Sequence, residues 1–221
     1  MIFVLDFDGT ITRRDTVDSL LNAFAHSSWK AIEAEWLAGR IDSRRCMTEQ
    51  LALVKLEQRE LMEFLRRVDI DPSFNDFYHD ARKIGTPVIV SDGLDLVIEH
   101  LMQVGTLPRM PFFANRAEFG HSRLHISFPH GSVDCAVNSG VCKCAVMGTF
   151  ARRFGGATVL IGDGMSDKCI AGRADYVFAK GALAQYCEEQ QMPYTAFCSF
   201  ADILARLNAQ SPVAAGLRAT S

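Results

Sequence analysis

Three short apolar runs, each ending abruptly at a small or acidic residue, constrain this fold more than any other feature of the sequence. They are residues 2–5 before Asp6, residues 88–90 before Ser91, and residues 158–161 before Gly162-Asp163. Uninterrupted runs of this length, rich in β-branched side chains, are typical of strands that are buried on both faces of a parallel sheet. Residues 175–179 form a fourth candidate strand.

Helical patterns separate these runs, for example over residues 94–103 and 144–154. This alternation of strand and helix predicts an open, Rossmann-like α/β fold with a parallel sheet. Ligands of such folds bind outside the carboxyl ends of the strands. Asp6, Ser91 and Asp163 are all expected at that edge.

The segment between the first and second runs is far longer than a single crossover needs, and it reads as several helices without a strand. Apolar residues recur three or four positions apart over residues 15–24, 29–37, 43–55 and 59–68, and Asp42-Ser43 suits the start of the third helix. We predict a helical cap of residues 13–70, inserted between the first two strands of a core made of residues 1–12 and 71–221. A core helix over residues 73–84 then leads back into the sheet.

Two other stretches have weaker patterns. Residues 111–128 mix aromatic and polar side chains and are expected to form short strands or a flap, whereas the small, polar residues 208–221 are expected to fray.

A chain of 221 residues, 48% of them hydrophobic, is long enough for one full core and a smaller satellite.

Charge and composition exclude several classes of partner. A net charge of −3 gives no basic field to attract nucleic acid, and no apolar stretch is long enough to span a bilayer. The apolar run of the first five residues ends at Asp6 and is too short for a signal peptide. The chain has seven cysteines, an odd number, which favours reduced thiols. We therefore expect a cytoplasmic protein whose partner is a small molecule, with neither nucleic acid nor membrane as a partner and its oligomeric state left open.

The segment Asp6-Phe7-Asp8-Gly9-Thr10 carries the first chemical signal. On an extended chain, two carboxylates two residues apart point to the same side while Phe7 turns into the protein. Gly9 then allows the chain to turn away sharply. A solvated surface turn is the alternative, but the position directly after a buried strand favours a functional pair.

The segment Gly162-Asp163-Gly164-Met165-Ser166-Asp167 repeats this design at the end of another strand. Capping of the following helix would explain one acid and leave Asp163 unexplained. Carboxylates of Asp6, Asp8, Asp163 and Asp167 that converge at one sheet edge repel each other without a cation. Oxygen ligands of this kind suit Mg²⁺, which predicts a magnesium site.

Lys143 lies at the start of a predicted helix, where a positive charge opposes the helix dipole. It is either solvated there or placed to face anions, and in the second case its loss is expected to leave stability unchanged or slightly raised. Ser91 can donate a hydrogen bond to a phosphate, assisted by the amides of Asp92 and Gly93 if they begin the next helix.

Taken in order, Asp-Phe-Asp-Gly-Thr-Ile-Thr, Ser91, Lys143 and Gly-Asp-Gly-Met-Ser-Asp resemble the four motifs of the haloacid dehalogenase superfamily. The resemblance implies that Asp6 is the nucleophile and that Asp8 is the general acid and base. It also implies that Ser91 and Lys143 bind the phosphate group. It further implies that Mg²⁺ is bound by the side chains of Asp6 and Asp163 and by the backbone carbonyl of Asp8. Asp167 is expected beside Asp163 at the same metal site. The implied reaction is hydrolysis of a phosphomonoester through an aspartyl phosphate.

A helical insertion between the first two motifs resembles the phosphoserine phosphatase branch. Within that branch, Phe128-Pro129-His130, the cysteines flanking Lys143 and Phe178-Ala179-Lys180 resemble the phosphatases of 2-hydroxy-3-keto-5-methylthiopentenyl-1-phosphate in methionine salvage. Phosphoserine is the alternative substrate, because Ser-Asp-Gly stands where that family is expected to have Ser-Gly-Gly. A phosphotransferase and a non-catalytic sensor of a phosphorylated ligand are the rival functions.

Two further groups of residues are candidates for binding. Arg13, Arg14 and Asp15 are the nearest polar residues to the first motif and are expected to approach the leaving group, although Asp15 also suits a helix start. A zinc site of Cys135, Cys142, Cys144 and His130 is disfavoured because no Cys-x-x-Cys pair accompanies them.

Overall fold

The predicted runs pair into one parallel sheet. The computed structural model describes residues 1–135 and 137–208. The strands are β1 (Ile2–Leu5), β2 (Thr86–Leu94), β3 (Phe112–Gly120), β4 (Arg123–Ser127), β5 (Thr158–Gly162), β6 (Tyr176–Ala179) and β7 (Thr195–Ala196). They lie in the order β4-β3-β2-β1-β5-β6-β7, and all described neighbours are parallel except β3 and β4. The predicted α/β fold class is confirmed.

Helices connect the strands much as the apolar spacing predicts. They are α1 (Thr16–Phe24), α2 (Trp29–Leu37), α3 (Ser43–Ala52), α4 (Gln58–Leu65), α5 (Phe74–Ile84), α6 (Asp95–Gln103), α7 (Lys143–Phe154), α8 (Lys168–Ala171), α9 (Gly181–Glu189) and α10 (Phe200–Asn208), with a 3₁₀ turn at Met165–Asp167. None of the helices described is both long and apolar enough to cross a membrane. The predicted fraying of the C-terminal tail concerns residues that, beyond Asn208, lie outside those described.

The sheet is buried on both faces, which explains its uninterrupted apolar strands. Along β1, Phe3 and Leu5 pack with α5 and α10, whereas Ile2 and Val4 pack with α7, α8 and α9. Successive residues of a strand point to opposite faces, so a strand covered on both sides needs apolar residues at every position. All four residues of β1 are fully buried.

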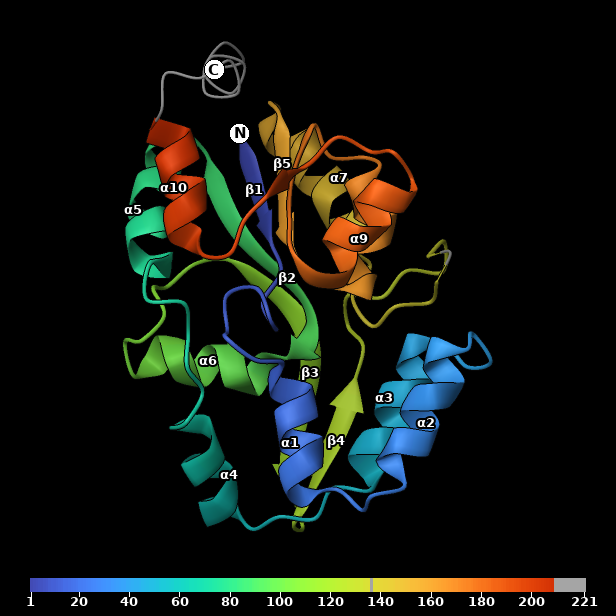
Figure 1. The fold of residues 1–221 in the computed structure, drawn as a ribbon. Helices are drawn as coiled ribbons and strands as arrows, with labels where there is room; N and C mark the ends of the chain where they lie inside the picture. The colour runs from blue at the N-terminus through green and yellow to red at the C-terminus, as the bar shows by residue number, and fades with distance from the viewer. Residues whose placement is uncertain (136, 209–221) are drawn as a thin grey trace.

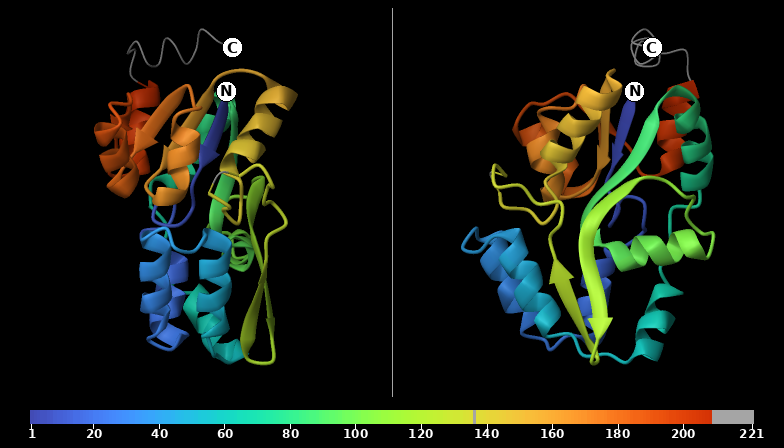
Figure 2. Two further views of the ribbon diagram at one scale, coloured as in Figure 1. Left: turned by 90° about the vertical axis from the view of Figure 1, so that its right-hand side faces the viewer. Right: turned by 180° about the vertical axis from the view of Figure 1, so that it is seen from behind.

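Helices α1 to α4 gather at one end of the molecule with the β3–β4 hairpin, below the strands of the central sheet (Figure 1 and Figure 2). The chain enters and leaves this helical segment through two connections that lie side by side. Thr12 forms an antiparallel bridge with Ile70, and the amide of Asp71 donates to the carbonyl of Ile11 at 2.8 Å. The two ends of the helical segment are therefore connected to the core at neighbouring positions.

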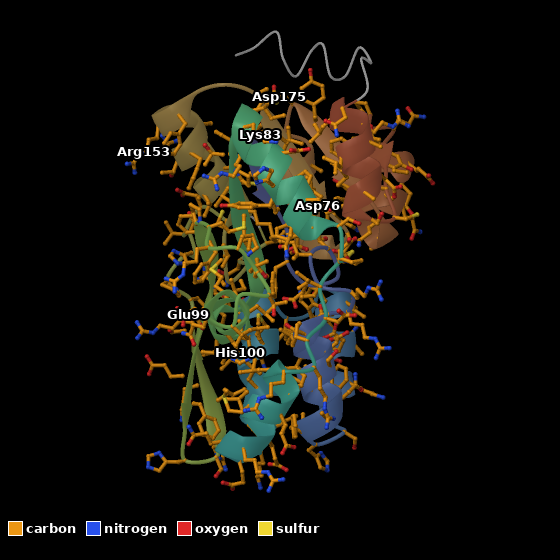
Figure 3. The ribbon with its side chains drawn as sticks, turned by 90° about the vertical axis from the view of Figure 1, so that its left-hand side faces the viewer. Asp76, Lys83, Glu99, His100, Arg153 and Asp175 are labelled. Carbon is orange, nitrogen blue, oxygen red and sulfur yellow. The ribbon has the colours of Figure 1, made fainter. Side chains whose placement is uncertain are left out.

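The region expected to form short strands or a flap is the β3–β4 hairpin. Its turn residues, His121 and Ser122, have φ values of 51° and 57°, the left-handed conformation that a two-residue hairpin turn requires. His121-Ser122 is not a sequence that predicts such a turn, as Asn-Gly would be. Figure 3 shows the side of the molecule near this hairpin, with Glu99 and His100 on α6 below Asp76 and Lys83 on α5.

The second strand corrects one part of the sequence analysis. The strand β2 continues through Ser91, Asp92 and Gly93 to Leu94, and α6 begins only at Asp95. The register between β2 and β3 shifts between Val90 and Leu94, which marks a bulge. The amides of Asp92 and Gly93 therefore belong to a bulged strand and do not begin a helix, and bulges of this kind often redirect side chains beside active sites.

Candidate active site

Lys143 is the central cation of the candidate site. It is 1% exposed, and its ammonium donates to Asp6 Oδ1 at 2.8 Å and to Asp167 Oδ1 at 2.6 Å. Asp6 follows β1, Asp167 follows β5 in the 3₁₀ turn, and Lys143 begins α7. The structure thus places Lys143 facing anions and excludes the alternative in which it is solvated.

The carboxylates of Asp6, Asp163 and Asp167 form an acidic edge at the carboxyl ends of β1 and β5. One oxygen from each lies within 4.8 Å of the others. Opposite ligands of Mg²⁺ lie about 4.2 Å apart when each bond is about 2.1 Å, so small shifts would bring these oxygens into range. Oxygen donors alone also suit this ion. The acidic edge therefore fits Mg²⁺.

Neighbouring groups hold two of these carboxylates in place. The hydroxyl of Thr10 donates to Asp163 Oδ1 at 2.5 Å, and the amides of Asp163 and Gly164 each donate to Asp167 Oδ2 at 3.2 Å. Gly9, with a φ of 72°, lies so close that a Cβ there would be 2.5 Å from Asp163 Oδ2. The turn after β1 thus needs glycine both for its conformation and for the space that Asp163 occupies.

The charges at this edge do not balance. Burial, followed by repulsion from Asp167, raises the pKa of Asp6 well above its usual range despite the contact with Lys143. Burial also raises the pKa of Asp163, with Asp167 adding to the effect. Burial alone would lower the pKa of Lys143, but Asp167 and Asp6 outweigh it and raise that pKa. Three carboxylates face one ammonium, so a divalent cation would relieve the excess negative charge.

Asp8 occupies a different position from the acidic edge. Its Oδ1 accepts hydrogen bonds from the amide and hydroxyl of Thr16 at 2.9 and 2.5 Å, and its Oδ2 accepts from Ser91 at 3.5 Å. Burial raises the pKa of Asp8, against the effect of Thr16. Its side chain is not among the carboxylates that gather at the acidic edge. The side chain of Asp8 therefore lies outside the group of described carboxylates that could hold a metal ion.

Ser91, Asp92 and Gly93 have three separate roles in the bulge of β2. Ser91 is fully buried, and its hydroxyl accepts the amide of Gly93 at 2.9 Å. A Cβ on Gly93 would overlap Asp8 Oδ2 and lie 3.1 Å from Ser91 Oγ. The side chain of Asp92 accepts from the hydroxyl of Ser43 at 3.0 Å and from the amide of Val141 at 2.7 Å. Asp92 thus connects the start of α3 to the loop that precedes Lys143.

Asp6, Asp8, Asp163 and the residues of the β2 bulge open into one cleft of about 190 Å³ between the sheet edge and the helical segment. The residues that line it are Asp6, Asp8, Asp15, Val17, Asp18, Glu33, Trp36, Ser43, Cys46, Met47, Gln50, Ser91, Asp92, Gly93, Asp163, Gly164, Met165 and Ser166. The sequence analysis named the residues of the four motifs and Asp15. It missed the contributions of α2 and α3, because nothing in a helical pattern shows which face meets a distant strand.

The expectation that Arg13 and Arg14 approach the leaving group is wrong, because neither lines this cleft. Both are exposed and line a separate cavity with Arg67 and Asp69, where Arg13 Nη1 lies 3.7 Å from Asp69 Oδ2. They are directed away from the cleft because the chain turns outward after Thr12 to enter the helical segment.

All seven cysteines are free thiols. Among the described residues, Cys135, Cys142, Cys144 and His130 do not gather into a metal-binding group. Cys144 instead contacts Cys169, with 3.4 Å between the two sulfur atoms.

Known proteins match this chain over most of its length. A profile of the haloacid dehalogenase-like hydrolase family matches residues 3–171. A 2-hydroxy-3-keto-5-methylthiopentenyl-1-phosphate phosphatase of Geobacillus kaustophilus is 31% identical over 92% of this chain and 94% of its own length. A protein of the same name from Brevibacillus brevis is 29% identical over 92% and 93%. This chain therefore belongs to the haloacid dehalogenase-like hydrolase family, and the motif-based prediction is confirmed.

Solved structures share the fold. A hydrolase of this family from Salmonella enterica serovar Typhi superposes with a TM-score of 0.74, at 18% identity, over 95% of this chain and 72% of its own. A substrate-bound phosphoserine phosphatase gives a TM-score of 0.67, at 17% identity, over 93% and 97%. The arrangement of sheet and helices is thus common to hydrolases with little sequence in common.

Gly93→Ala is expected to lower the kcat/KM for p-nitrophenyl phosphate by about a hundredfold, because the added methyl displaces Asp8. Gly120→Ala is the matched control, since a Cβ on Gly120 meets no atom within 4 Å. Steady-state kinetics and melting temperatures of both variants check this. A Gly93→Ala enzyme with parental activity would show that the position of Asp8 does not matter.

Lys143→Ala is now expected to lower the free energy of unfolding by about 3–5 kcal/mol, since it leaves buried carboxylates uncompensated. This corrects the expectation of unchanged or raised stability, which considered only the helix dipole. Denaturant unfolding in the presence of a chelator measures the change, with Lys55→Ala, the loss of an exposed lysine, as the control. Equal stability of the two variants would contradict the structural role of the ion pairs.

Proposed function

We propose that this protein hydrolyses a small phosphomonoester, with Asp6 as the nucleophile and Asp8 as the general acid and base. The observation that carries the proposal is that Asp6 and Asp8 line the same cleft. Lys143, buried behind the cleft, fixes Asp6, while Asp8 is held separately by Thr16 and Ser91. One carboxylate is thus prepared to attack and the other to exchange a proton.

The residue types suit a two-step reaction. Asp6 attacks phosphorus and forms an aspartyl phosphate as the bond to the leaving oxygen breaks. Asp8 gives its proton to that oxygen, and burial supports this role because it raises the pKa of Asp8 and favours the acid form. Asp8 then takes a proton from the water that hydrolyses the intermediate. A solved neighbour of this fold is described as a phospho-aspartyl intermediate analogue of phosphoserine phosphatase.

Two groups of residues complete the proposed site. Ser91 and the amides of Asp92 and Gly93 would bind phosphate oxygens, the Gly93 amide in exchange for its bond to Ser91 Oγ. Lys143 would offset charge as the phosphoryl group transfers. Asp6, Asp163, Asp167 and the carbonyl of Asp8 would hold Mg²⁺, which when bound neutralises part of the negative charge of the phosphate.

We further propose that residues 13–70 act as a cap over a core formed by residues 1–12 and 71–221. Three features support this division: the single place of attachment, the cleft between the two parts and the bond from Ser43 to Asp92. A cap closed over the aspartyl phosphate would exclude bulk water and contact the leaving group.

The proposed substrate is 2-hydroxy-3-keto-5-methylthiopentenyl-1-phosphate. Support comes from curated relatives of that name, which match more than nine tenths of this chain. Phosphoserine is the alternative, since solved phosphoserine phosphatases share the fold. Release of inorganic phosphate from a panel of phosphomonoesters that contains both compounds compares them directly.

Asp6→Asn is expected to reduce turnover at least a hundredfold while the protein still folds and unfolds in one cooperative thermal transition. The amide keeps the volume of the side chain but is a far weaker nucleophile. Phosphate release from p-nitrophenyl phosphate provides the measurement. Activity above about one hundredth of the parent would exclude Asp6 as the nucleophile.

Removal of divalent cations is expected to abolish turnover, and added Mg²⁺ is expected to restore it, because the acidic edge carries excess negative charge. Dialysis against a chelator followed by Mg²⁺ titration checks this. The melting temperature should also rise with Mg²⁺, since an ion that binds only the folded protein stabilises it. Full turnover in chelator would mean that no essential metal binds.

A further inference from the structure

The cleft extends well beyond the phosphate-binding residues, along one face of α3. Ser43, Cys46, Met47 and Gln50 all line it, and their spacing of three, four and seven residues places them on the same side of the helix. Ser43 marks the inner end through its bond to Asp92. Gln50 lies about 10 Å farther along the helix axis, at 1.5 Å per residue. The cleft therefore has room for an elongated leaving group.

Glu33 of α2 faces this outer part of the cleft and is held there from α3. Its Oε2 accepts from the amide of Gln50 at 2.6 Å and from the thiol of Cys46 at 3.8 Å. Gln50 is only 3% exposed, so this amide fixes the position of the carboxylate. The other oxygen, Oε1, accepts no hydrogen bond from the described residues. Glu33 is thus an oriented acceptor with one free oxygen.

The cleft around this acceptor is lined by acids and by no basic side chain. Asp18 of α1 lines it together with Asp15, whose pKa burial raises to about 8, and no Lys or Arg is among the described residues that do so. Asp15 caps α1 by accepting the amide of Asp18, whereas the carboxylates of Asp18 and Glu33 have no cationic partner in the described chain. Burial and, to a smaller extent, Asp18 raise the pKa of Glu33. A carboxylate on the leaving group would meet Glu33 here, and no lysine or arginine among the described lining residues would bind it.

The remaining wall is apolar. Val17, Trp36 and Met47 line the cleft beside Glu33, which offers a surface for an alkyl or thioether chain. The leaving group named in the curated relatives has a hydroxyl, a ketone and a methylthio end and no carboxylate. Serine, the leaving group of phosphoserine, carries an ammonium beside its carboxylate and has no apolar end.

We propose that Glu33, positioned by Gln50, selects leaving groups that present a hydroxyl donor and excludes those that bear a carboxylate. This inference rests on the proposed phosphomonoesterase activity and assigns its substrate class as an uncharged, hydroxylated and partly apolar alcohol. Glu33 accepts the hydroxyl through Oε1, while Trp36 and Met47 contact the apolar end.

The test compares 3-phosphoglycerate with glycerol 1-phosphate, whose leaving groups differ only by a carboxylate in place of a hydroxymethyl group, and uses p-nitrophenyl phosphate to establish phosphatase activity. For the parent enzyme, kcat/KM is expected to be at least tenfold higher for glycerol 1-phosphate than for 3-phosphoglycerate. In Glu33→Gln, the ratio of the two kcat/KM values is expected to fall by about tenfold, because the amide keeps the volume and can still accept from Gln50 but carries no charge.

Glu35→Gln is the matched control. It removes the same charge from the same helix, but Glu35 is exposed, pairs with Arg40 and does not line the cleft, so the ratio should stay at the parental value. A parent that prefers 3-phosphoglycerate, or a ratio unchanged in Glu33→Gln, would overturn the specificity assignment while leaving the phosphatase function in place. A parent that releases no phosphate from any of the three compounds would overturn both.

Discussion

The buried ammonium of Lys143 is the interaction on which the rest of the site depends. Parallel strands β1 and β5 end side by side, so acids that follow them are forced together at one edge. An unfavourable charge at a helix start costs about 0.3–1 kcal/mol, whereas a buried carboxylate that loses its partner costs about 3–5 kcal/mol. The second quantity is larger, which explains why a lysine is placed where the helix dipole disfavours it. The same contact directs Asp6 toward the cleft.

Much of this arrangement follows from the sequence because strand ends and motifs are local features. The apolar runs before Asp6 and Asp163 predict buried parallel strands, and parallel strands bring their carboxyl ends to one edge. The four helices of residues 13–70 are also local, since their apolar spacing and the cap at Asp42 depend on nearby residues. The fold class and the convergence of the acids could therefore be predicted without coordinates.

Other features depend on contacts between distant residues and could not be predicted. The sequence predicts a role for Asp92 only through its backbone amide, but its side chain joins Ser43 to Val141 across the site. The bulge in β2 is defined only by its register with β3, a strand whose turn at His121-Ser122 lacks the usual residues. Which helix faces meet the cleft is likewise set by tertiary packing, so Glu33 and Gln50 gave no signal in the sequence.

The paired connections at Thr12 and Ile70 have a consequence for how proteins of this kind can diversify. Because the chain leaves the core and returns to it at neighbouring positions, the intervening residues can lengthen, shorten or be exchanged without altering the order of the strands. Selection for a new metabolite can then act on α2 and α3 while the residues of the reaction stay where the sheet places them. The inserted residues can therefore evolve independently of the core that holds the reacting residues.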